Sequence, residues 1–241
     1  MKIGVSTNGK TIELEHGVNV FPPSVASTTL LCSVYDRDIK NKKVADIGCG
    51  TGYLGLGLLA RGAARLYGTD IQDEAIRAAG NNAALNNFEK ISAFNVGDFC
   101  EPILNKAGLP GKFDVVISNP PQTPSALLSR DSHFLGRDGG PLGNDKILHV
   151  LENSPRWLAP NGILYIPVFS HSDPDQTKKK ASACFKQVAV ITSHDVAFDG
   201  RKLALCKIFG QIYKQGHGNR IVHHGHPYWR IEVLKCRYPI L

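Results

Sequence analysis

An apolar run that ends in a glycine-rich turn is the feature that most constrains how this chain can fold. The run and turn read Val44-Ala45-Asp46-Ile47-Gly48-Cys49-Gly50-Thr51-Gly52, and an amphipathic stretch over 53–63 follows. Glycine suits a turn where the chain reverses without room for side chains and where the backbone must approach a ligand closely. The free N–H groups of a following helix point at whatever occupies such a turn. We therefore expect strand, turn and helix, with either an ordinary tight turn or a binding site at the junction.

A second apolar stretch, Ala64 to Asp70, ends in an acid 24 residues beyond Asp46. An acidic side chain near this offset can accept hydrogen bonds from both hydroxyls of a ribose. The alternative is a helix N-cap, because residues 72–86 look helical and Asp is favoured at that position. The glycine-rich turn that precedes Asp70 favours the ribose interpretation.

These motifs resemble those of the class I S-adenosylmethionine-dependent methyltransferases. The segment DIGCGTG is similar to the family's first motif and Asp70 to its second, while Gly97-Asp98-Phe99 follows a predicted strand where such enzymes hold the adenine. A dinucleotide fingerprint spaces its last two glycines three apart, whereas the spacing here is two throughout. The resemblance implies S-adenosylmethionine as the cofactor, bound by Asp46, Gly48, Gly50, Gly52, Asp70, Asp98, Phe99 and Asn119.

A polar segment, Asn119-Pro120-Pro121-Gln122, follows the predicted buried strand 113–118. Ligands of open α/β sheets bind at the carboxyl ends of the strands. The two prolines stiffen the backbone, so the Asn119 side-chain oxygen and a proline carbonyl become two fixed acceptors that suit an –NH2 group. Such a pair would orient the nitrogen lone pair toward the sulfonium methyl, which is catalysis by positioning.

The same segment resembles the Asn-Pro-Pro-(Tyr/Phe) signature of methyltransferases that act on planar amino groups of adenine, guanine or glutamine. Gln122 departs from that signature, because it offers no aromatic face for stacking. The resemblance implies Asn119, Pro120 and Gln122 as catalytic residues acting on a nitrogen of a small-molecule, protein or nucleic-acid acceptor. An alternative is that the two acceptors hold the cofactor's own amino group, which would make the protein a cyclase or alkyl transferase that releases methylthioadenosine.

Short apolar strands alternate with helical stretches along most of the chain, which predicts a mostly parallel sheet covered on both faces. The expected fold is Rossmann-like α/β with a β-hairpin over 3–15 and a helix over 24–35 before the core. We expect one domain, 1–241, with a pre-core segment 1–40, a core 41–241 and an insertion at about 200–227. The seven predicted strands cover 43–47, 65–70, 91–96, 113–118, 163–169, 187–196 and 229–236.

Charge and composition leave a second function class open. Residues 178–241 hold 12 Lys and Arg against three Asp and Glu, a balance that could dock phosphate or an acidic partner. The alternative function is therefore a non-catalytic RNA- or protein-binding module with a methyltransferase fold, although nucleic acid is not the favoured partner. The charged loop 123–143 is a candidate lid or acceptor-recognition element, through Arg130, Asp131, His133, Arg137 and Asp138.

Compartment and metal content follow from composition. No apolar run approaches the roughly 20 residues that span a bilayer, and the N-terminus lacks a signal-peptide core. The six cysteines are scattered without a CxxC pair, which fits reduced thiols. We expect a cytoplasmic protein without a membrane partner and without a metal. A histidine cluster at 217, 223, 224 and 226 leaves zinc as an alternative.

Overall fold

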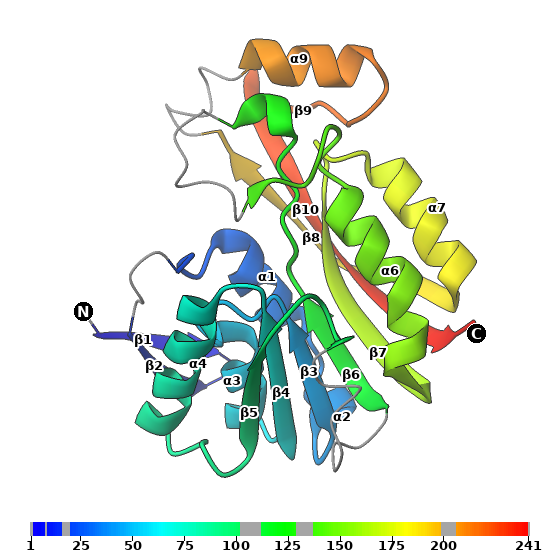
Figure 1. Ribbon diagram of the computed structural model, residues 1–241. Helices are drawn as coiled ribbons and strands as arrows, with labels where there is room; N and C mark the ends of the chain where they lie inside the picture. Colours follow the sequence, from blue (N-terminus) through cyan, green and yellow to red (C-terminus); the bar gives the residue numbers. More distant parts are fainter. Residues whose placement is uncertain are drawn as a thin grey trace.

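One twisted sheet organises the molecule, as the computed structural model shows for residues 2–7, 9–15, 20–101, 112–128, 137–198 and 206–240 (Figure 1). The strand order is β5-β4-β3-β6-β7-β10-β8, with β9 paired to β10 outside this path. Strands β3 to β7 run parallel, whereas β10 is antiparallel to both β7 and β8. The Rossmann-like, mostly parallel sheet predicted from the sequence is confirmed. The strands are β3 (Lys43–Ile47), β4 (Arg65–Asp70), β5 (Ser92–Val96), β6 (Phe113–Ser118), β7 (Leu158–Phe169), β8 (Phe185–Ala197), β9 (Ile221–His223) and β10 (His226–Pro239).

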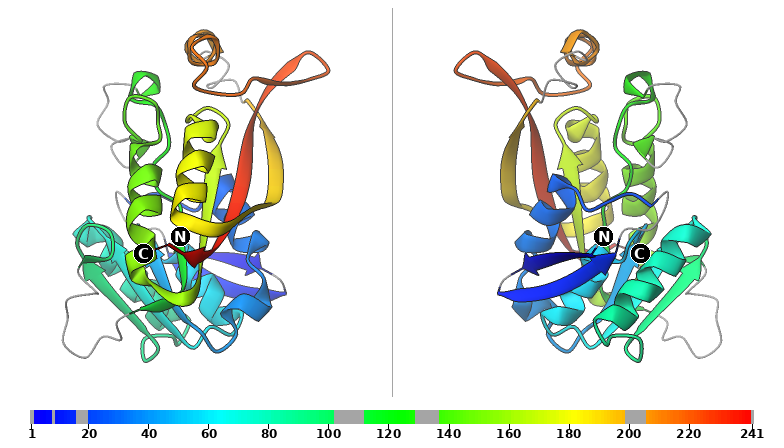
Figure 2. Two further views of the ribbon diagram at one scale, coloured as in Figure 1. Left: turned by 90° about the vertical axis from the view of Figure 1, so that its right-hand side faces the viewer. Right: turned by 90° about the vertical axis from the view of Figure 1, so that its left-hand side faces the viewer.

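Helices cover both faces of the sheet (Figure 2). Because side chains alternate along a strand, Val44 and Val115 pack toward α1 and α3, whereas Ala45 and Val116 pack toward α6. Burial on both faces explains why the central strands read as continuous apolar runs. The helices are α1 (Val25–Ser33), α2 (Asp36–Ile39), α3 (Tyr53–Ala60), α4 (Asp73–Leu85), α6 (Asp145–Trp157), α7 (Pro174–Cys184) and α9 (Cys206–Lys214), with a 3-10 turn at Ser125–Leu127.

The predicted N-terminal hairpin is present as β1 (Lys2–Thr7) and β2 (Lys10–Glu15). Ile12 and Leu14 are buried against the core. The backbone N–H of Glu15 donates to Asn82 Oδ1 of α4 at 2.7 Å. The hairpin therefore packs on the helix that follows the predicted ribose-binding strand.

The helix predicted over 24–35 is present as α1, with Ser24 as its N-cap, and it ends at Ser33 because Val34 and Tyr35 are extended. The short helix α2 follows outside the predicted range. The buried Arg61 guanidinium donates to the carbonyls of Leu31 and Val34. These bonds satisfy backbone oxygens that a continuous helix would have used internally. A long-range side chain therefore ends α1 at a point that the local sequence does not mark.

The insertion predicted at about 200–227 contains α9 and β9. Strands β9 and β10 form a hairpin through His224 and Gly225, both with positive φ, and this hairpin projects from the body of the protein (Figure 2). Among the helices that the structure describes, none has the length and apolar character needed to cross a bilayer.

Candidate functional site

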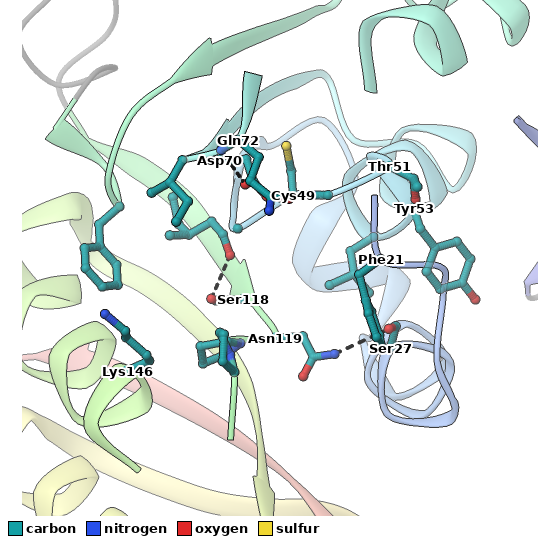
Figure 3. A pocket seen from close by; sticks show the side chains of 18 of the residues that line it. Phe21, Ser27, Cys49, Thr51, Tyr53, Asp70, Gln72, Ser118, Asn119 and Lys146 are labelled. Carbon is teal, nitrogen blue, oxygen red and sulfur yellow. Dashed lines mark hydrogen bonds between the residues drawn. The ribbon is translucent and has the colours of Figure 1, made fainter. Parts of the chain in front are cut away.

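A cavity of about 410 Å³ opens at the carboxyl ends of β3, β4, β5 and β6 (Figure 3). This is the edge at which open α/β sheets bind ligands. Parallel neighbouring strands bring residues far apart in the chain to the same edge. The predicted residues that line the cavity are Gly48, Gly50, Asp70, Asp98, Phe99, Asn119 and Pro120.

The glycine-rich turn forms one wall of the cavity. Gly48, Gly50 and Gly52 have φ values of 72°, 53° and 80°. Residues other than glycine rarely adopt backbone angles in this region. Gly48 and Gly50 line the cavity. Gly52 instead begins α3, and a Cβ added to it would lie 3.2 Å from Ala79 Cβ. The structure therefore separates two glycines at the cavity from one that packs the turn against α4.

Asp46 lies behind the turn and is not among the described residues that line the cavity. Its side chain is fully buried, and Oδ2 accepts a hydrogen bond from Gly55 N at 2.8 Å. Oδ1 has no hydrogen-bond partner. Burial raises the pKa of Asp46 to about 7, against the opposing Gly55 bond, and the charge of Asp70 adds to the increase. The position of Asp46 indicates a residue that supports the turn rather than a direct cofactor ligand.

Asp70 faces the cavity with a carboxylate held by backbone groups. Oδ2 accepts from Gly50 N at 2.9 Å, and Oδ1 accepts from Gln72 N at 3.0 Å. Each carboxylate oxygen can accept a further bond. The N-cap of α4 is Gln72, so the alternative role of Asp70 as the N-cap residue is wrong.

Phe99 and Asp98 form the opposite end of the cavity after β5. The Phe99 ring stacks on His149 of α6 with ring centres 4.0 Å apart. Two further residues of α6, Lys146 and Val150, line the same region. Sequence reasoning missed both, although their spacing of four residues on a predicted helix places them on one face.

Asn119 directs a polar amide at the cavity from the end of β6. Its Nδ2 donates to Ser27 Oγ of α1 at 3.3 Å. Figure 3 shows the amide nitrogen turned toward Ser27 and the amide oxygen turned away from it. Ser118 Oγ donates to the Ile47 carbonyl at 2.8 Å and so ties β6 to β3 beside the cavity.

Gln122, which the sequence predicts to be catalytic, is buried away from the cavity. The side chain is 2% exposed and lies outside the set of described residues that line the cavity. Nε2 donates to the Pro167 carbonyl at 2.9 Å, and Oε1 accepts from Phe169 N at 3.3 Å. These bonds satisfy two backbone groups of β7, so the position of Gln122 indicates a structural rather than a catalytic role.

The structure describes the charged loop 123–143 only in part. Arg130, Asp131 and His133 lie outside the described residues. The Arg137 guanidinium lies 4.5 Å from the centre of the Phe21 ring, and Phe21 lines the cavity. The loop therefore contacts the pre-core segment at the edge of the cavity.

Two histidines of the predicted cluster, His217 and His223, each pair with a different aspartate. His217 Nδ1 lies 3.0 Å from Asp173 Oδ2, and His223 Nε2 lies 2.7 Å from Asp195 Oδ2. Asp195 also accepts two bonds from Arg230, which lower its pKa to about 2. Within the described part of the chain, no three His, Cys, Asp or Glu side chains could hold a metal together.

Comparison with known proteins identifies the family. Residues 16–129 match the model of the methyltransferase small domain. A protein of Methanocaldococcus jannaschii that is provisionally named a protein N5-glutamine methyltransferase is 30% identical over 190 residues, which cover 78% of this chain and 91% of that protein. A release factor glutamine methyltransferase of Rhodospirillum rubrum is 35% identical over 132 residues, covering 52% of this chain but only 39% of that enzyme.

Solved structures share the fold at low sequence identity. The T. thermophilus 16S rRNA N2 G1207 methyltransferase has a TM-score of 0.64 and 16% identity, and the match covers 98% of this chain and 50% of that one. The ribosomal protein L11 methylase of Lactobacillus delbrueckii has a TM-score of 0.55 and 17% identity, with 90% and 81% covered.

The sheet order, the glycine-rich turn and the cavity at the strand ends define a Rossmann-like methyltransferase. The chain belongs to the S-adenosylmethionine-dependent methyltransferases of the small-domain type, which act on nitrogen. It is therefore an enzyme with S-adenosylmethionine as its cofactor.

Proposed function

We propose that this enzyme methylates the side-chain amide nitrogen of a glutamine in a protein. The observation that carries the proposal is that Asn119 and Pro120 line the same cavity as Gly48, Gly50 and Asp70. The M. jannaschii relative, matched over 91% of its length, is named as a protein N5-glutamine methyltransferase. Both observations support a planar –NH2 acceptor placed beside the cofactor.

The residues present fit S-adenosylmethionine, which supplies a methyl group on a positively charged sulfur. Gly48 and Gly50 leave room for its methionine part. No protein atom lies within 4 Å of the position that a Cβ on Gly48 would take, so the space beside this glycine is open. The positive φ of Gly48 keeps other residues from that position. Each carboxylate oxygen of Asp70 can accept a further hydrogen bond, so the side chain can bind both ribose hydroxyls. In this proposal Asp98 and Phe99 hold the adenine.

Asn119 and Pro120 provide the catalytic contribution in this proposal. The Asn119 oxygen and the Pro120 carbonyl accept the two N–H hydrogens of the acceptor amide, so its lone pair is turned toward the methyl group. The nitrogen forms a bond to the methyl carbon as the carbon–sulfur bond breaks, and the amide nitrogen then loses one proton to water. Positioning of this kind lowers the barrier without a strong base.

The proposal also includes the domain organisation of the enzyme and the cell compartment in which it acts. We infer a single domain over 1–241 that carries an insertion at about 200–227. Other relatives are named as methyltransferases of release factors and of ribosomal protein L11. Because these proteins act in translation, their names support a cytoplasmic enzyme.

Cofactor binding is tested with Asp70→Ala. Loss of a charged acceptor of two hydrogen bonds removes about 3 kcal/mol of binding free energy, which weakens S-adenosylmethionine binding on the order of 100-fold in calorimetry. Asp73→Asn is the matched control, because Asp73 is exposed and pairs with Arg77 on α4. Equal affinity of the two variants would contradict the assignment of Asp70.

The acceptor is tested with methyl-labelled S-adenosylmethionine and three defined acceptors: a release factor, ribosomal protein L11 and ribosomal RNA. We expect label in a protein, with a mass increase of one methyl group located on a glutamine by tandem mass spectrometry. Label in RNA alone would contradict the proposal. Release of methylthioadenosine without an acceptor would instead favour cyclisation or another alkyl transfer.

A further inference from the structure

Ser27 contacts Asn119, the first residue of the polar segment 119–122, from outside the sheet. It lies in the first turn of α1, lines the cavity and is 8% exposed. Its Oγ accepts the 3.3 Å hydrogen bond from Asn119 Nδ2, across 92 residues of sequence (Figure 3). The same Oγ belongs to a capping box with Ser24, whose side chain accepts from Ser27 N at 3.2 Å.

Ser27 and Ser24 form a small hydrogen-bond network beside Asn119. A hydroxyl oxygen accepts two hydrogen bonds and donates one. Ser27 Oγ accepts from Ser24 N at 3.1 Å and from Asn119 Nδ2. In this arrangement its own proton is directed at Ser24 Oγ, 2.9 Å away, whereas Ser24 is the donor of that pair when the network runs the other way. Neither a lone pair nor a proton of Ser27 remains for another partner.

The orientation of the Asn119 amide in the structure belongs to this arrangement of the network. The two ends of an Asn amide have nearly the same shape, so packing alone does not distinguish them. A flipped amide would place Oδ1 against Ser27 Oγ and would require the hydrogen bond between the two serine hydroxyls to reverse, so that Ser24 donates to Ser27 and Ser27 donates to Oδ1. In the structure Nδ2 faces Ser27, and Oδ1 is free to face the acceptor.

We propose that Ser27 is a positioning residue for methyl transfer, which orients the Asn119 amide so that Oδ1 accepts from the acceptor –NH2 group. This inference rests on the proposed function, because the orientation matters only for an acceptor that donates hydrogen bonds. Ser27 acts through Asn119 and needs no contact with the reacting atoms.

The kinetic test compares variants of α1 with the best acceptor of the labelling experiment. Ser27→Ala lowers kcat roughly fivefold to tenfold, the effect of one lost hydrogen bond, while KM for S-adenosylmethionine changes less than about twofold. Ser27→Thr keeps the hydroxyl and restores kcat. Ser33→Ala is the matched control, since Ser33 is also 8% exposed on α1 but bonds Thr29 O and Thr192 Oγ1. It lowers the melting temperature and leaves kcat unchanged.

A double-mutant cycle separates orientation from general damage. In an Asn119→Asp background the side chain has two equivalent oxygens, so Ser27→Ala causes no further loss of kcat. A loss of the same size in both backgrounds, or an equal loss in Ser33→Ala, would overturn the proposal. If Ser27→Ala does not fold, Ser27→Cys replaces it, because a thiol is a weak acceptor.

A second measurement does not depend on the acceptor. In 15N-labelled protein, the Asn119 side-chain NH2 signals are identified by their loss in Asn119→Asp. Their hydrogen exchange is expected to be at least about tenfold faster in Ser27→Ala than in the wild type and in Ser27→Thr. Unchanged exchange refutes the inference about Ser27, whereas absent methyl transfer with altered exchange refutes only the proposed function.

Discussion

Gln122 and Asp46 are polar side chains that surround the cavity without lining it. Gln122 satisfies two backbone groups of β7, and Asp46 accepts from the α3 backbone at Gly55. A buried polar side chain is retained where it pairs with backbone that would otherwise be unsatisfied. At the scale of single residues, these two therefore hold the strand ends and the turn in place for residues that face the cavity.

The raised pKa of Asp46 predicts an unusual pH dependence of stability. Its pKa rises from an ordinary 3.8 to about 7 on folding, because burial disfavours the charged form. The folded state therefore binds the proton more tightly, and its contribution to stability, present below pH 4, is lost as the pH rises to 7. We expect the free energy of unfolding of the wild type, relative to Asp46→Asn, to fall by about 4 kcal/mol over this range.

Urea denaturation of both proteins at pH 4 and pH 8 measures this difference. Asp46→Asn keeps an oxygen for Gly55 N, so the turn stays paired at both pH values. Asp73→Asn serves as the control for an exposed carboxylate. A wild-type to Asp46→Asn difference that does not change with pH would show that Asp46 is already charged in the folded state.

Helix α3 approaches its neighbours closely because it carries glycines on its packed faces. A Cβ on Gly55 would lie 2.4 Å from Leu66 Cδ1 of β4, and one on Gly57 would lie 2.6 Å from Leu31 Cδ2 of α1. Real Cβ atoms do not approach carbon atoms so closely. At the scale of elements, these glycines therefore set the spacing between the turn, the sheet and the pre-core helix.

Two helical glycines are predicted to respond to alanine with opposite signs. Gly55→Ala overpacks the contact with Leu66 and lowers the free energy of unfolding by about 1–3 kcal/mol. Gly80 lies inside α4, where an added Cβ meets nothing within 4 Å. Gly80→Ala therefore raises the free energy of unfolding by up to about 1 kcal/mol, because alanine has a higher helix propensity than glycine. Urea titrations measure both, and changes of the same sign would contradict the packing argument.

A buried charge cluster connects the pre-core segment to the far end of the chain. Asp38 Oδ2 of α2 accepts from Lys235 Nζ of β10 at 2.5 Å and from the Tyr165 hydroxyl of β7. The two charged side chains are 10% and 8% exposed. Burial alone would raise the pKa of Asp38, but the hydrogen bonds from Lys235 and Tyr165 outweigh it and lower that pKa. At the scale of the whole molecule, this cluster links elements 197 residues apart.

Removal of one charge from this cluster is predicted to cost more than removal of both. Lys235→Met leaves a buried carboxylate unpaired and lowers the free energy of unfolding by about 3–5 kcal/mol. The double variant Asp38→Asn with Lys235→Met recovers part of that loss, because no buried charge remains. Chemical denaturation of the single and double variants, with exposed Lys186→Met as the control, measures the effect. A double variant as unstable as the single one would argue against an uncompensated charge.

Local patterns predicted the elements that carry the cofactor. The ranges 43–47, 65–70 and 113–118 coincide with β3, β4 and β6, because strands buried on both faces show as bounded apolar runs. The turn at Gly48 and Gly50 was also predictable, since its backbone geometry requires glycine. The order of strand ends then placed Asp70 and Asn119 at one edge, where the structure finds them.

Tertiary structure alone decided how the site is completed. Ser27 reaches Asn119 across 92 residues, and Gln122 reaches Pro167 across 45. Arg61 ends α1 from 27 residues away. None of these pairs can be predicted from the sequence, because the partner of a polar side chain depends on which residues the packing of distant elements brings within hydrogen-bond distance. The sequence by itself thus determined the fold and the cofactor, whereas the contacts that Asn119 makes at the cavity depend on packing between distant elements.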